Sequence, residues 1–162
     1  AHVFHASALE LSGEIESAHA AFRRASRLRP DSELPFIARG LVLARQTKFP
    51  ASLLEFRSAL ALKLYHLDAR SYLAASLSQT GKKKDALKEA RIVFRQDDSR
   101  SELQMLILDL LFDLDDEDAV IIELEELLAA QPQNKKARGF LRQIYKKQGR
   151  QEEAKSLEVK EE

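Results

Sequence analysis

The chain has 162 residues, no cysteine, and 26 basic against 26 acidic residues, so its formal net charge is zero. This composition excludes disulfides and thiolate chemistry, and it argues against attraction of the whole chain to nucleic acid or membranes. No apolar run approaches the roughly 20 residues that a membrane-spanning helix needs. The first residues, AHVFHASALE, lack a signal-peptide pattern and begin part-way into a repeat. We interpret the chain as a soluble piece of a longer protein, in a cytoplasmic or periplasmic compartment that the sequence leaves open.

A repeat of 34 residues runs through the chain. Steps of this length from Gly81 reach Gly13, Thr47, Asp115 and Gly149. The same steps from Ala86 reach residues of small or medium size, namely Ala18, Ser52, Val120 and Ala154. A fixed period of this kind is typical of stacked-repeat proteins. We predict one domain over residues 1–162, with repeats at 1–32, 33–66, 67–100, 101–134 and 135–162.

Each repeat is expected to form two amphipathic helices that are separated near the Gly81 position. In the third repeat, apolar residues recur at helical spacing on both sides of Gly81, at Leu73, Leu77, Leu87, Ala90, Val93 and Phe94. Glycine accepts the left-handed conformation in which many helices end. Because the turn is short, the two helices should form an antiparallel hairpin. Pro30 and Pro132 share one repeat position, where they would stop the second helix, and Pro50 suits the first turn of a helix.

Aligned positions predict how the hairpins pack. Ala6, Gly40 and Ala74 share a position where a small residue allows two helices of one hairpin to approach closely. Residues that share one repeat position form a column, and three further columns are apolar. They are Leu9, Leu43, Leu77, Leu111 and Tyr145; Phe22, Phe56, Ala90 and Leu124; and Ala25, Ala59, Val93 and Leu127. A single hairpin cannot bury all these faces, whereas stacked hairpins bury them in one continuous core. The last helix carries Glu158 and Glu161 at core positions and is expected to cap the array.

This pattern resembles the tetratricopeptide repeat (TPR) family, whose unit has 34 residues with small, apolar and proline positions at these offsets. The resemblance covers essentially the whole chain. There is no tryptophan, Thr47 and Asp115 replace the turn glycine, and Leu64 and Asp98 replace the proline. The resemblance implies an all-α fold, a right-handed α-solenoid of about five antiparallel helical hairpins. Pentatricopeptide repeats, which read RNA, are one residue longer and would drift out of register, and another kind of helical array is the remaining alternative.

Metal sites are disfavoured. His2 and His5 lie three residues apart, but no third ligand is near them in the sequence. The acidic run 113–126 has Asp118 and Leu124 where an EF-hand loop starting at its first residue requires Gly and Glu. Three of its aspartates are better interpreted as capping and complementing the next helix, namely Asp115, Asp116 and Asp118.

Catalytic motifs are also missing. The sequence has no phosphate-binding glycine-rich loop, no serine nucleophile elbow and no HExxH motif. We therefore predict a protein that is not an enzyme and that uses no cofactor.

Charge is segregated near the end of the chain. Residues 101–134 contain ten acidic residues and no Lys or Arg, whereas residues 135–150 contain seven basic residues and no acidic one. A basic ligand would be attracted to the fourth repeat and an acidic one to the fifth. The lysine runs 82–84 and 146–147 have no interleaved aromatic residues, so nucleic-acid binding is disfavoured.

In the TPR family the first helix of each hairpin lines a concave groove that binds peptides or helices, and the resemblance implies such a groove here. Ile37, Leu41, Met105 and Phe112 are expected to stay exposed on it, which is typical of an interaction surface. The candidate partner-binding residues are Ile37, Leu41, Arg45, Tyr72, Met105, Asp109, Phe112, Asp113 and Lys136. Further groove positions in the fifth repeat are Gln143, Lys146 and Lys147. The basic clamp by which some family members hold the carboxylate of chaperone tails is absent, because its positions are Val3, Ser7, Ala38, Asp68 and Tyr72.

The first functional hypothesis is a protein–protein interaction scaffold that binds a partner peptide or helix in this groove, with a charge-selective end around Asp109 and Asp113. The alternative is a structural section of a longer TPR scaffold in a multiprotein assembly, such as a bacterial envelope secretion or exopolysaccharide-export machine. Both predict a protein partner, no nucleic acid and no direct membrane insertion, and the array ends offer surfaces for self-association.

Overall fold

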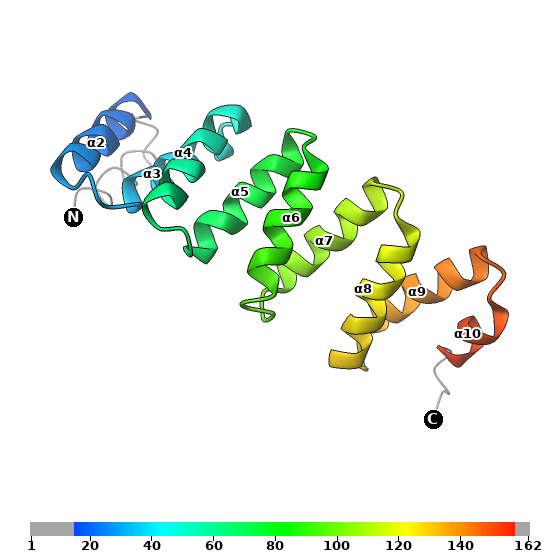
Figure 1. Ribbon diagram of the computed structural model, residues 1–162. Coiled ribbons are helices and arrows are strands. Elements are labelled where there is room, and N and C mark those ends of the chain that lie inside the picture. The colour runs from blue at the N-terminus through cyan, green and yellow to red at the C-terminus, as the bar shows by residue number, and fades with distance from the viewer. Residues whose placement is uncertain (1–14, 158–162) are drawn as a thin grey trace. The chain divides into compact units, whose positions relative to one another are not determined.

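Residues 15–157 are described by the structure, a computed structural model, and within them helices are the only regular secondary structure (Figure 1). The described part of the chain divides after Leu110 into two compact units, one before and one after this residue. The helices of the first unit are α2 (Ile15–Leu28), α3 (Leu34–Arg45), α4 (Phe49–Leu62), α5 (Leu67–Gln79) and α6 (Lys83–Phe94). Helix α7 (Ser101–Asp113) runs across the division, and the second unit adds α8 (Glu117–Ala130), α9 (Lys135–Lys147) and α10 (Gln151–Ser156). The fold is an all-α helical repeat, as predicted.

Four helix ends have the same backbone conformation at the predicted interval of 34 residues. The left-handed residues are Thr47, Gly81, Asp115 and Gly149, with φ of 58°, 74°, 56° and 75°. At the first, the Thr47 N–H donates to the Ala44 carbonyl at 2.9 Å and the Lys48 N–H donates to the Leu43 carbonyl at 2.9 Å. The other three ends make the corresponding pair of bonds. These are Schellman motifs, and they satisfy carbonyls that a helix end otherwise leaves unpaired.

Helix starts follow local sequence signals. Pro35 and Pro50 occupy the first turns of α3 and α4, where a missing N–H costs nothing. The residue that precedes each of three other helices caps it with its side chain. In α5 the Ala69 N–H donates to His66 at 3.3 Å, in α8 the Ala119 N–H donates to Asp116 at 3.1 Å, and in α9 the Ala137 N–H donates to Asn134 at 3.1 Å. The predicted capping role is therefore confirmed for Asp116, whereas Asp115 occupies the left-handed turn position.

The core of the first unit joins successive hairpins. Helix α3 packs on α4, α4 on α5 and α5 on α6. Buried residues that form one apolar cluster include Leu53, Phe56, Leu73, Leu77 and Ala86. A Cβ added at Gly40 would lie 2.6 Å from the Phe56 ring, so the small residue at this position does allow close approach of α3 and α4. Within each hairpin an ion pair also links the two helices. Arg39 of α3 pairs with Glu55 of α4 at 2.5 Å, and Arg70 of α5 pairs with Glu89 of α6.

The second unit is built around α9, which packs on α8 and on α10. Tyr145 of α9 is buried, its hydroxyl donates a hydrogen bond to Glu125 of α8, and the Arg150 guanidinium lies 4.1 Å above its ring. In α10 only Ala154 is buried. The glutamates at 158 and 161, on which the prediction of a capping helix rests, lie outside the described residues, as do His2 and His5. Helices α2 to α10 include none with the length and apolar character to cross a membrane.

Candidate functional site

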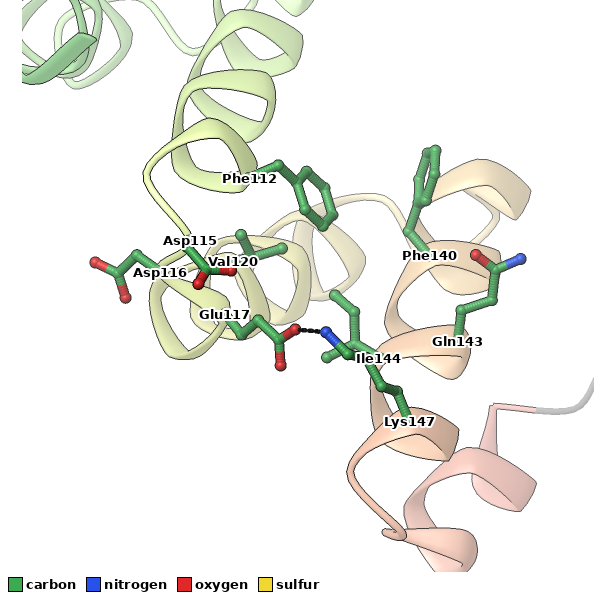
Figure 2. A pocket seen from close by; sticks show the side chains of 9 residues that line it. All are labelled: Phe112, Asp115, Asp116, Glu117, Val120, Phe140, Gln143, Ile144 and Lys147. Carbon is green, nitrogen blue, oxygen red and sulfur yellow. Dashed lines mark hydrogen bonds and ion pairs between the residues drawn. The ribbon is translucent and has the colours of Figure 1, made fainter.

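A cleft of about 460 Å³ lies within the second unit, at the junction of three helices (Figure 2). The end of α7 contributes Phe112, and the turn and first residues of α8 contribute Asp115, Asp116, Glu117 and Val120. Helix α9 contributes Phe140, Gln143, Ile144 and Lys147. The Schellman turn at Asp115 positions one wall of this cleft because it reverses the chain directly after Phe112. The spacing of residues 140, 143, 144 and 147 places the α9 contributions on one helical face.

Two phenylalanine rings make the apolar part of the cleft. Phe112 and Phe140 are each 43% exposed, and their ring centroids lie 6.2 Å apart at an interplanar angle of 56°. Val120 and Ile144 are buried beneath them. Tilted aromatic pairs at this distance attract one another. The pair leaves nearly half of each residue exposed, and the two rings together form a contiguous exposed apolar surface.

Carboxylates stand at the start of α8, on the other side of the cleft. Glu117 accepts hydrogen bonds from Lys147 and, at 3.3 Å, from Gln148 of the following turn. These bonds hold the pKa of Glu117 below its usual range, and the Glu117 carboxylate raises the pKa of Lys147. Both groups are therefore charged at neutral pH. Figure 2 shows the Glu117–Lys147 contact as a dashed line beside the Ile144 side chain, with Asp115 and Asp116 beside the turn.

The lining of the cleft combines an apolar surface with charged groups. Its lining residues include no Ser, Thr, Cys or His, so the hydroxyl, thiol and imidazole groups of serine- or cysteine-type catalysis are not among them. Within residues 15–157, no three His, Asp or Glu side chains gather in a way that would hold a metal ion. An apolar surface bordered by carboxylates can hold an apolar side chain together with a nearby polar or cationic group.

Several predicted site residues are on the surface. Met105, Tyr72 and Phe112 are exposed, as are Arg45, Asp109, Asp113 and Lys136. Of the nine residues predicted for the site, Phe112 lines the cleft, and the further groove positions Gln143 and Lys147 line it as well.

The expected exposure of Ile37 and Leu41 is wrong. Ile37 is only 8% exposed and belongs to the apolar cluster of the first unit, and Leu41 is half-buried against that cluster. The physical reason is that α3 contacts α5 directly, so first helices of neighbouring hairpins cover this part of each other's surface. The buried Ile37 side chain therefore offers little surface to a partner, whereas part of Leu41 remains accessible.

Phe140 was missed by the sequence analysis, although a signal was present. It lies two repeat lengths after Tyr72, which is one of the predicted groove residues. Extending that column from the third to the fifth repeat would have identified it.

Comparison with solved structures identifies the class of fold. No family model and no curated protein sequence matches the chain. YrrB, described as a TPR protein with an unusual peptide-binding site, aligns with a TM-score of 0.76 at 17% identity, over 96% of this chain and 80% of YrrB. MamA (residues 41 to the end) from Desulfovibrio magneticus RS-1 aligns with a TM-score of 0.74 at 18% identity, over 96% of this chain and 88% of MamA. A tetratricopeptide repeat protein from Parabacteroides merdae ATCC 43184 aligns with a TM-score of 0.78 at 17% identity, over 96% of this chain and 62% of that protein.

These likenesses define a helical repeat protein. More particularly, the chain has the tetratricopeptide repeat fold that its 34-residue period predicts.

Proposed function

We propose that this protein is a protein-interaction scaffold and that a partner peptide or helix binds in the cleft of the second unit. The observation that carries the proposal is the exposed pair Phe112 and Phe140 above a buried apolar floor. Interaction surfaces favour aromatic anchors of this kind, and burial of the exposed part of each ring would stabilise a complex by about 2 kcal/mol. YrrB, which shares the fold, is described as having a peptide-binding site, and this supports the same class of function here.

The test begins with a random peptide library displayed on phage and selected against the immobilised full chain. The affinity of the selected peptide is then measured by calorimetry for the native protein and for Phe112→Ala and Phe140→Ala. We expect each substitution to weaken binding about tenfold or more, because the partner side chain loses its apolar contact.

Ile122→Ala is the matched control. Ile122 belongs to α8 of the same unit and is 57% exposed, but it does not line the cleft. Its substitution should leave the affinity unchanged. Equal losses for Ile122→Ala and Phe140→Ala, or a selected peptide that binds both phenylalanine variants as well as the native protein, would contradict the proposal.

A further inference from the structure

Negative charge is concentrated at one end of the cleft. Three carboxylates line it, from Asp115, Asp116 and Glu117, and Asp118 joins them in an adjoining depression that also includes Lys147 and Gln148. Four carboxylates against the one ammonium of Lys147 leave a local charge of −3. The N-terminus of α8 contributes only about +0.5 of a charge through its backbone dipole, so most of the negative charge remains.

The lysine within this group is already engaged. Lys147 donates to Glu117, and this bond keeps both groups ionised, so Lys147 offsets Glu117 and leaves the three aspartates to set the field. Asp115 and Asp118 are exposed. One oxygen of Asp116 accepts the Ala119 N–H, and its second oxygen is left for another donor.

The apolar and acidic parts of the cleft meet at a single turn. Phe112 lies three residues before Asp115, and Figure 2 shows Asp115 at the turn below Phe112, Glu117 below it, and the Asp116 side chain pointing outward from the turn. A ligand that packs an apolar side chain against the exposed parts of the rings therefore brings its neighbouring residues close to the acidic turn. A carboxylate on those neighbours would be repelled, whereas a guanidinium would gain charge-assisted hydrogen bonds and contact with the ring faces.

We infer that the partner of this cleft is a cationic polypeptide segment, in which an aromatic or large aliphatic side chain is directly followed by Arg or Lys. The inference rests on the proposed function and adds the partner's chemistry to it. Arginine fits better than lysine, because its planar fork can engage two carboxylate oxygens at once.

The experiment measures fluorescence anisotropy of three labelled peptides with the full chain: Gly-Leu-Phe-Arg-Arg-Gly, the same peptide with Glu-Glu in place of Arg-Arg, and the same peptide with Ser-Ser there. The test variant combines Asp115→Asn, Asp116→Asn and Asp118→Asn, which removes the charge but keeps a side chain that caps helices and tolerates the left-handed turn. The control variant combines Asp31→Asn, Asp98→Asn and Glu126→Gln, exposed residues that do not line the cleft. It changes the net charge of the protein by the same amount.

We expect the native chain and the control variant to bind the Arg-Arg peptide about tenfold or more tightly than the Glu-Glu peptide at low salt. Each of the three exposed aspartates contributes modestly to this preference, and their contributions combine. The test variant should lose most of this preference, and added salt should reduce it in the native chain. If all three peptides bind equally and Phe140→Ala abolishes binding, the cationic partner is refuted and the cleft remains the binding site. If the test and control variants lose the preference equally, the aspartates are not its source and the inference is also refuted. If no peptide, including those selected from the library, distinguishes the native chain from Phe140→Ala, the proposed function fails as well.

Discussion

Thr47 and Asp115 hold a left-handed backbone conformation that L-residues with a side chain adopt at a cost of about 1–2 kcal/mol. At the two equivalent positions, Gly81 and Gly149 hold it without that cost. The repeat therefore preserves the backbone conformation where it does not preserve the residue. The surrounding Schellman hydrogen bonds and the packing of the two helices impose it.

Replacement of Thr47 by glycine should stabilise the protein by about 0.5–1 kcal/mol, since the strained φ is relieved although the chain gains freedom when unfolded. Gly81→Ala should destabilise it by about 1 kcal/mol. No atom lies within 4 Å of a Cβ added at Gly81, so this substitution tests the backbone conformation alone. Urea denaturation followed by circular dichroism measures both. A Thr47→Gly variant that is less stable than the native protein would show that the Thr47 side chain, which donates to the Gln46 carbonyl, contributes more than the strain costs.

Gly40 is required because there is no room for a side chain at its position, and not because of its backbone dihedral angles. Gly40→Ala should destabilise the protein by about 1–3 kcal/mol, because the new methyl group would overlap the buried Phe56 ring. Gly139→Ala in α9 is the matched control: nothing lies within 4 Å of the added Cβ, so higher helix propensity should stabilise the protein by up to about 1 kcal/mol. Thermal unfolding of the two variants compares them, and a stabilising Gly40→Ala would mean that α3 and α4 separate without penalty.

At the scale of the elements, one buried hydroxyl links α8 to α9. Burial, reinforced by the hydrogen bond to the Glu125 carboxylate, raises the pKa of Tyr145 from 10.0 to about 12. Below pH 10 both folded and unfolded chains keep this proton, and the contribution to stability is complete. As the pH rises, the unfolded chain loses the proton first, so the contribution declines between the unfolded and the folded pKa.

The free energy of unfolding should therefore decrease between about pH 10 and 12, and Tyr145→Phe should make that decrease shallower. At neutral pH the same substitution should cost about 1 kcal/mol, because the Glu125 hydrogen bond is lost. Urea titrations of both proteins at a series of pH values measure the difference. Identical pH slopes in the two proteins would show that Tyr145 ionises alike in the folded and unfolded chains.

At the scale of the whole molecule, stability should vary along the chain as it does in other repeat proteins, where each hairpin is stabilised mainly by its neighbours. Helix α5 is covered by α3, α4 and α6, and it supplies Ala69, Leu73 and Leu77 to the apolar cluster. Helix α10 has six residues and packs on α9 with Ala154 as its buried residue.

Native-state hydrogen exchange should therefore show the slowest amide exchange in α5 and the fastest helical exchange in α10, because local opening of α10 exposes little apolar surface. Mass spectrometry of proteolytic fragments after exchange resolves the two helices. Equal protection in α5 and α10 would indicate that the described part of the chain unfolds in one step.

Most of the fold could be predicted from the sequence, because helix periodicity, capping and turn chemistry are local properties that a 34-residue register repeats. Steps from Gly81 located all four left-handed turns among the described residues, and the small column located the close approach at Gly40. The candidate site was predicted only in part: Phe112, Gln143 and Lys147 came from expected groove positions, whereas Phe140 did not.

The sequence by itself determined where the hairpin turns fall and which columns supply the core, since a residue's place in a repeat specifies its own helix and its partner helix. Only the tertiary structure decided which apolar residues stay in contact with water. Ile37 and Phe112 are both apolar residues of the first helix of a hairpin. Helix α5 covers the face of α3 that carries Ile37, whereas the Phe112 ring contacts Phe140 and remains nearly half exposed. Exposure depends on what the neighbouring hairpin places opposite a side chain, and that is a property of the packed array and not of the residue.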